Sequence, residues 1–176
     1  WTPSSRFVDS STPPLSKEIK KTGVFVDASL DYIETIIKDH NLQAVQLHGK
    51  ENPEYCSYIK SLDVEVIKAF SVKDYFDFSS LDPYESACDF YLFDTKGELP
   101  GGNGYGFDWS ILKHYPSKKP FFLSGGIGLE DVKQILELKK INLPLYAIDV
   151  NSKFETAPGV KKIDELEQFK NELYEL

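Results

Sequence analysis

Methionine is absent from the 176-residue sequence, and arginine occurs once, at Arg6. Since position 1 is not methionine either, we expect an upstream segment to be missing from the sequence. No apolar run approaches the roughly 18 residues that a membrane-spanning helix needs, and the first residues lack the apolar stretch of a signal peptide. These absences predict a soluble, cytoplasmic protein that does not insert into a membrane.

Cysteine occurs only at Cys56 and Cys88, without a CxxC motif or an accompanying histidine pair. This spacing indicates neither a zinc site nor a disulfide framework, so we expect a reducing compartment. Cys56 falls in a predicted helix and Cys88 just before a predicted strand, which favours a packing role for both. The net charge of −8 and the pI near 4.9 argue against a nucleic-acid partner and leave a small anionic ligand possible.

Short strands rich in Val, Ile and Phe alternate with amphipathic helices along a chain of single-domain length. The predicted strands cover residues 22–26, 44–48, 64–70, 90–94, 120–123 and 146–150. The first predicted helix follows a cap at Ser29, and the second begins near Pro53. A weaker helical segment follows the strand at 64–70 and runs through Phe76. Further helices are predicted over 108–115, from Leu129 and from Ile163. Strands that are apolar on both faces indicate a parallel sheet covered by helices, as in a doubly wound sheet or a (β/α)8 barrel.

Polar residues stand where four of these strands end, at His48, Asp94, Ser124 and Asp149. In both candidate folds the carboxyl ends of the strands form the ligand site. Burial of a carboxyl group favours its protonated form, so Asp94 is a candidate general acid; the alternative is an aspartate that accepts hydrogen bonds from loop N–H groups. His48 is a candidate proton carrier or donor, or else a packed, satisfied histidine.

Two glycines, Gly125 and Gly126, separate the strand ending at Ser124 from the next helix. Glycine lets a backbone approach a ligand closely, and the free N–H groups at a helix start attract phosphate. A tight turn without a ligand explains the pair equally well. A second glycine-rich segment, 101–109, is either a mobile lid or an irregular connection, and its length and glycine density favour a functional loop.

The segment after the sixth strand offers neutral phosphate donors at Asn151 and Ser152. Asp149 would repel a phosphate, so we expect it to orient hydroxyl or backbone groups. The same segment also has a structural interpretation, as a turn at Pro158 and Gly159 that leads into the last helix. Arg6 suits bidentate binding of a carboxylate, although a surface ion pair is the alternative.

Seven motifs follow one another along nearly the whole chain: SSRFV, GVFV, AVQLHG, LFDT, GGNGYGFDW, LSGGI and AIDVNS…E…PG. In this order they resemble phosphoribosylanthranilate isomerase, a family of tryptophan biosynthesis. The resemblance implies a single (β/α)8-barrel domain over residues 1–176 and an Amadori rearrangement of a phosphorylated small molecule without metal or organic cofactor. It leaves open whether the protein is a monomer or a weak homodimer.

The resemblance also implies a role for each site residue. Asp94 corresponds to the general acid, and Arg6 to the arginine that holds the anthranilate carboxylate. His48 and Asp149 line the substrate site. The phosphate site corresponds to Ser124, Gly125, Gly126, Asn151 and Ser152.

One departure concerns the family's general base, a cysteine in a KxCG motif at the end of the first strand. This motif is absent, and neither Cys56 nor Cys88 matches it. We therefore expect strand one, helix one and most of strand two to be missing from the sequence. The competing hypotheses are a fragment or degenerate paralogue that binds phosphorylated ligands without turnover, and a phosphate-binding barrel enzyme with another substrate.

Overall fold

A computed structural model describes residues 16, 18–73, 75–95 and 109–174. Hydrogen bonds join the strands of its main sheet in sequence order, from β1 to β6. These strands are β1 Thr22–Phe25, β2 Ala44–Leu47, β3 Glu65–Ser71, β4 Phe90–Asp94, β5 Phe121–Ser124 and β6 Leu145–Ile148. All six predicted strands are confirmed, and no bound is wrong by more than two residues.

The described residues form two compact units. The amino-terminal unit comprises 16, 18–70 and 77–92, and the carboxy-terminal unit comprises 71–73, 75–76, 93–95 and 109–174. Strand β4 therefore begins in one unit and ends in the other.

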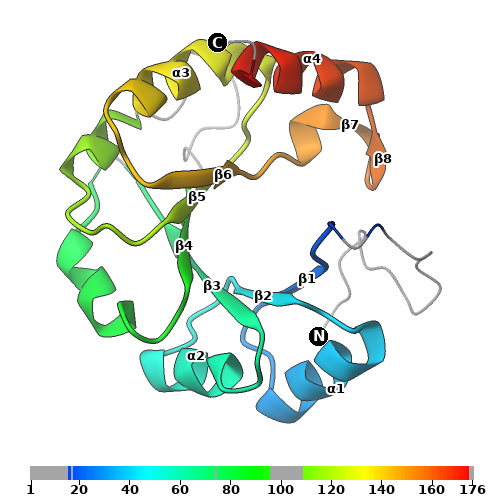
Figure 1. Cartoon of the computed structure of the whole chain (residues 1–176), viewed down its shortest axis with the longest axis vertical. Helices are drawn as coiled ribbons and strands as arrows, with labels where there is room; N and C mark the ends of the chain where they lie inside the picture. The colour runs from blue at the N-terminus through cyan, green and yellow to red at the C-terminus, as the bar shows by residue number, and fades with distance from the viewer. Residues whose placement is uncertain (1–15, 17, 74, 96–108, 175–176) are drawn as a thin grey trace. The chain divides into compact units, whose positions relative to one another are not determined.

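In the amino-terminal unit, β1, β2 and β3 pair in parallel, and helices α1 (Leu30–His40) and α2 (Pro53–Lys60) cover them on one side (Figure 1). The predicted cap at Ser29 is confirmed, because its side chain accepts a hydrogen bond from the Tyr32 N–H. Asn52 caps α2 in the same way, and Pro53 occupies its first turn, where a missing N–H costs nothing.

In the carboxy-terminal unit, β5 and β6 pair in parallel, and helices α3 (Val132–Lys140) and α4 (Ile163–Tyr174) lie side by side outside them (Figure 1). An aromatic cluster fills the space near the start of β5. The Phe93 ring lies 5.5 Å from that of Tyr115 and 5.1 Å from that of Phe121. Rings at these separations stabilise the core beyond the area they bury.

Two predictions need correction, and one pair of strands was not predicted. The weak helix through Phe76 is wrong; a 3-10 helix, η1 (Phe78–Tyr84), follows that residue instead and contains Pro83, which an α-helix interior tolerates poorly. The segment at 108–115 forms a 3-10 helix, η2 (Trp109–His114), rather than an α-helix. The predicted turn at Pro158 and Gly159 is confirmed, and it joins two short antiparallel strands that we did not predict, β7 (Glu155–Ala157) and β8 (Val160–Lys161).

Candidate functional site

The carboxyl ends of β4 and β5 are hydrogen-bonded to each other through Thr95. Its N–H and its hydroxyl both donate to the Ser124 carbonyl, at 2.9 and 2.8 Å. The Trp109 indole N–H donates in turn to the Thr95 hydroxyl, at 3.1 Å. Thr95 and Trp109 flank residues 96–108, so this contact joins the two described residues on either side of them.

Asp94 lies at this junction and is 5% exposed. Its backbone carbonyl accepts a hydrogen bond from the Val72 N–H at 2.9 Å, which fixes the chain beyond β3. The carboxyl group is thus held on the last residue of a buried strand, where solvent screens charge weakly. This is the placement that the sequence predicted for Asp94.

Glycine is favoured at the two positions after Ser124 for different structural reasons. Gly125 has φ +116°, and a Cβ on it would lie 2.6 Å from the Thr95 backbone nitrogen, so the close approach of two chains excludes any side chain. Gly126 has φ +70°, but a Cβ there would meet no described atom within 4 Å. Among the described residues, therefore, no atom obstructs the approach of a ligand to the Gly126 backbone.

Asp149 lies directly beside Ser124. The Ser124 hydroxyl donates to Asp149 Oδ2 at 3.0 Å, and the Asp149 N–H donates to the Leu123 carbonyl at 2.8 Å. This agrees with the expectation that Asp149 orients a hydroxyl group. Because the Ser124 hydroxyl donates its proton to the Asp149 carboxylate, the Ser124 Oγ can only accept a further hydrogen bond.

Asn151 is oriented by the β7–β8 hairpin. Lys161 Nζ donates to Asn151 Oδ1 at 2.6 Å and to Glu155 Oε1 at 2.9 Å. Because an ammonium group only donates, it fixes the amide oxygen of Asn151 and directs the NH₂ group elsewhere as a donor. Ser152 follows as an exposed residue that begins a 3-10 helix, η4 (Ser152–Phe154).

His48 belongs to the amino-terminal unit, where its backbone N–H donates to the Phe25 carbonyl at 2.8 Å. Its Nδ1 lies 3.0 Å from Gln46 Oε1. The amide oxygen accepts only, so Nδ1 carries the hydrogen, and in the neutral ring Nε2 is the acceptor. The partial burial of His48 and its contact with Gln46 fix the orientation of the imidazole ring.

A buried ion pair next to His48 was missed from the sequence. Lys68 Nζ donates to Glu51 Oε2 at 3.0 Å and to the carbonyls of Leu47 and Gly49 at 3.2 and 2.8 Å. Glu51 accepts in addition from the N–H groups of Gly49 and Asp27. The signal was present, since a lysine inside a strand that is otherwise apolar requires a buried partner.

Both cysteines are fully buried, in agreement with the predicted packing role. Burial raises the pKa of the Cys56 thiol to about 12. Within the described ranges, no group of three or more His, Cys, Asp or Glu side chains is placed to hold a metal ion. The helices there include none long and apolar enough to cross a membrane. Arg6 and residues 101–108 lie outside the described residues.

Comparison with known proteins identifies the relatives of this chain. The family described as N-(5'phosphoribosyl)anthranilate (PRA) isomerase matches residues 4–172. The N-(5'-phosphoribosyl)anthranilate isomerase of Parabacteroides distasonis is 42% identical over 85% of this chain and 67% of its own length. That of Phocaeicola vulgatus is 38% identical over 97% of this chain and 82% of its own length.

Solved structures of the same kind share the fold. The phosphoribosyl anthranilate isomerase of Thermotoga maritima superposes with a TM-score of 0.77 at 32% identity, covering 92% of this chain and 76% of that one. A second isomerase structure, in complex with reduced 1-(o-carboxyphenylamino)-1-deoxyribulose 5-phosphate, superposes with a TM-score of 0.74 at 29% identity. The match covers 92% of this chain and 75% of that one. With the observed strand order, this likeness confirms the predicted (β/α)8-barrel fold class.

Proposed function

The chain belongs to the N-(5'-phosphoribosyl)anthranilate isomerase family, and on that premise we propose how it carries out the Amadori rearrangement of N-(5-phosphoribosyl)anthranilate. The product is 1-(2-carboxyphenylamino)-1-deoxyribulose 5-phosphate. The observation that supports the proposal best is the junction of Asp94, Thr95 and Ser124, which holds a buried carboxyl group beside the glycine pair. An acid and a phosphate loop are thereby brought to the same strand ends.

Asp94 is the general acid in this proposal. It protonates the ring oxygen of the ribose, so that the furanose opens to a Schiff base between C1 and the anthranilate nitrogen. A base then removes the proton from C2 to give an enolamine, which tautomerises to the ketone. His48 and Asp149 line the substrate, and Arg6 holds the anthranilate carboxylate.

The phosphate group binds at the loops after β5 and β6. The N–H groups around Gly125 and Gly126, together with Asn151 and Ser152, donate to its oxygens. Two observations support this assignment: no described atom lies within 4 Å of a Cβ on Gly126, and the Asn151 amide oxygen accepts from Lys161, which leaves the NH₂ group as the donor.

Neither cysteine is the base that the second proton transfer needs. Cys56 is buried, and its thiol pKa of about 12 keeps it protonated at neutral pH. Cys88 is buried as well, and its thiol donates to the Tyr84 carbonyl at 3.4 Å. The base is therefore assigned to neither of them. A cytoplasmic location and a monomer or weak homodimer remain predictions.

Turnover of purified protein tests the acid assignment. Asp94→Asn is expected to lower kcat by about 100-fold or more, because the amide cannot supply the proton. The variant should still bind reduced 1-(o-carboxyphenylamino)-1-deoxyribulose 5-phosphate, the reduced product analogue. Asp82→Asn, an exposed carboxyl group on η1, is the matched control and should leave kcat unchanged. Undiminished turnover in Asp94→Asn would refute the acid role, and analogue binding without any wild-type turnover would favour a non-catalytic binding protein.

Binding measurements separate this substrate from other phosphorylated sugars. Arg6→Lys is expected to weaken binding of the reduced product analogue by about 1.5–3 kcal/mol, the worth of a charge-assisted hydrogen bond. Binding of ribose 5-phosphate, which has no anthranilate carboxylate, should not change. Equal loss for both ligands would contradict the role of Arg6.

A further inference from the structure

An ion pair connects the two loops of the proposed phosphate site. Lys153 Nζ lies 2.8 Å from Glu130 Oε1, and the two side chains are 54% and 61% exposed. Glu130 belongs to a 3-10 helix, η3 (Leu129–Asp131), that follows the glycine pair, and Lys153 follows Asn151 and Ser152. The hydrogen bond between them raises the pKa of Lys153 and lowers that of Glu130, so both groups are charged at neutral pH.

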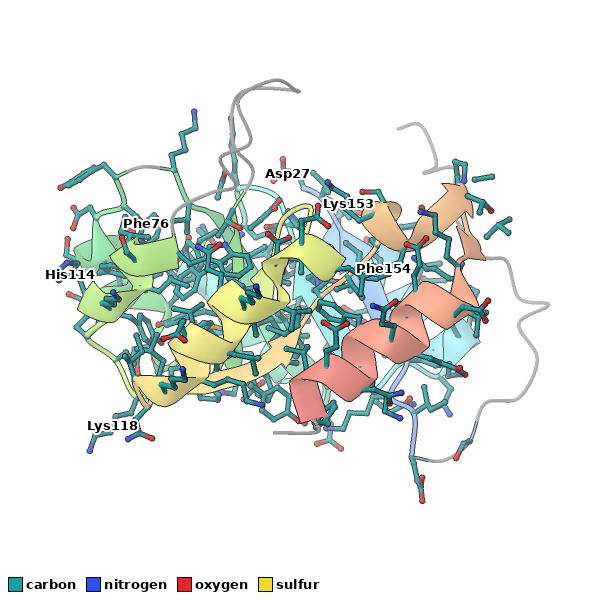
Figure 2. All side chains as sticks on the ribbon, turned by 90° about the horizontal axis from the view of Figure 1, so that it is seen from above. Asp27, Phe76, His114, Lys118, Lys153 and Phe154 are labelled. Carbon is teal, nitrogen blue, oxygen red and sulfur yellow. The ribbon has the colours of Figure 1, made fainter. Side chains whose placement is uncertain are left out.

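The Glu130 carboxylate and the backbone next to Lys153 are positioned by their surroundings, whereas the Lys153 side chain is more than half exposed. A Cβ on Gly128 would lie 2.4 Å from Glu130 Oε2, so the carboxylate rests directly against the loop backbone. Phe154, next to Lys153, is fully buried, and its ring lies 5.1 Å from that of Phe169 in α4. Figure 2 shows the two neighbours diverging, with Phe154 directed toward α4 and Lys153 toward the start of α3.

The charges of these loops oppose a bound phosphate. Residues 124–131 and 149–153 contain three carboxylates, at Glu130, Asp131 and Asp149, and one cation, Lys153. A phosphate dianion here is repelled by the carboxylates unless a cation offsets them. Lys161 is engaged with Glu155, whose side chain is 3% exposed, and is therefore committed to the hairpin.

We propose that Lys153 is a phosphate-binding residue of this chain, and that its ammonium group moves from Glu130 to the substrate phosphate when the ligand binds. An exposed ion pair is weak, so giving it up costs little, and lysine is a flexible point charge that reaches either partner. The phosphate dianion offers more charge than a single carboxylate. This inference rests on the proposed function, because it adds a residue to the phosphate site proposed there.

The two partners should have opposite effects on phosphate affinity. Lys153→Met removes the cation and is expected to weaken binding of inorganic phosphate roughly tenfold or more. Glu130→Gln removes the competitor and is expected to tighten binding roughly two- to fivefold. If the pair only fastens the two loops together, both substitutions weaken binding, and that result would overturn the proposal.

Calorimetric titration with inorganic phosphate, and with the reduced product analogue, gives these affinities without relying on turnover. Lys140→Met is the matched control, because Lys140 forms an exposed pair with Glu137 on α3, at 2.6 Å; it should leave phosphate affinity unchanged. Unfolding midpoints in urea verify that each variant is folded. Wild-type affinity in Lys153→Met refutes the inference alone, whereas a wild-type protein that binds neither ligand refutes the phosphate site itself.

Discussion

Lys68 Nζ and Glu51 Oε2 lie 3.0 Å apart, with 3% and 2% of their side chains exposed. Burying two charges is costly, and here hydrogen bonds from Lys68 to backbone carbonyls and to Glu51 from backbone N–H groups offset the cost. The pair therefore fixes the backbone of the loop that begins at His48.

Removing one partner of this pair should be strongly destabilising. Lys68→Met leaves the Glu51 carboxylate buried without its cation, and we expect the free energy of unfolding to fall by about 3–5 kcal/mol. The double variant Lys68→Met/Glu51→Gln should lose less, because no charge remains buried. Urea unfolding measures both.

The exposed lysine Lys140 provides the comparison for Lys68. It pairs with Glu137, and both side chains are more than half exposed. Lys140→Met should change the free energy of unfolding by no more than about 0.5 kcal/mol. Similar losses of unfolding free energy in Lys68→Met and Lys140→Met would show that the buried pair contributes no more to stability than the exposed pair.

The hydroxyl group of Thr95 should contribute to stability through Trp109. Thr95→Val keeps the shape of the side chain but leaves the buried indole N–H without its acceptor, at a cost of about 1–3 kcal/mol. Thr35→Val is the control, since the Thr35 hydroxyl donates to the Asp31 carbonyl on an exposed helix face. Urea unfolding followed by tryptophan fluorescence should give a lower midpoint for Thr95→Val, and equal midpoints would contradict the prediction.

The alternation of strands and helices could be predicted because it depends on local patterns. An apolar run such as FYLFD needs burial on both faces, and a serine before an amphipathic stretch marks a helix start. The positions of Asp94 and Asp149 at strand ends could be predicted for the same reason, since both stand at the ends of such runs. Nothing in this argument needs a distant contact.

The features that were missed depend on pairing between distant segments. The partner of Lys68 follows from the register of β2 and β3, which sets Leu47 beside Lys68 and brings the lysine to the loop at Glu51. The short strands of the β7–β8 hairpin have only three and two residues, too few to show a periodic pattern. In both cases tertiary contacts decide the structure.

The Cys56 thiol should be unreactive in the folded protein. Burial raises its pKa from 9.0 to about 12, so the thiolate that attacks a disulfide reagent is scarce at pH 8. We expect little labelling by a chromogenic disulfide reagent in buffer and complete labelling in urea. Rapid labelling of the folded protein would contradict the burial of this residue.

The same shift in the Cys56 pKa predicts a pH dependence of stability. As the pH rises above 9.0, the unfolded chain releases the thiol proton while the folded protein retains it, so the unfolded state is favoured. Stability should fall between pH 9.0 and about 12, and Tyr55, whose pKa is raised from 10.0 to about 12, acts in the same direction. Urea midpoints should fall less steeply with pH in Cys56→Ala than in the wild type, and parallel curves would contradict the assignment.

The two glycines after Ser124, which belong to the proposed phosphate site, should respond differently to alanine. Gly125→Ala places a methyl group 2.6 Å from the Thr95 backbone nitrogen, so the two backbone segments must move apart. The loss in the free energy of unfolding should therefore exceed the cost of the positive φ alone. Gly126→Ala meets no described atom within 4 Å, and only its φ of +70° is unfavourable, at about 1–2 kcal/mol. The urea unfolding midpoint of Gly125→Ala should therefore be lower than that of Gly126→Ala.

Gly126→Ala should nevertheless be the variant that isolates ligand binding, because its methyl group occupies the position where the phosphate is proposed to lie. Gly159→Ala is the matched control: Gly159 also has a positive φ, +83°, and no described atom near its Cβ position, but it lies in the β7–β8 turn. Titration with inorganic phosphate should therefore show weaker binding for Gly126→Ala and wild-type binding for Gly159→Ala. Wild-type binding by both variants would mean that Gly126 serves only the turn, and the phosphate would have to bind elsewhere.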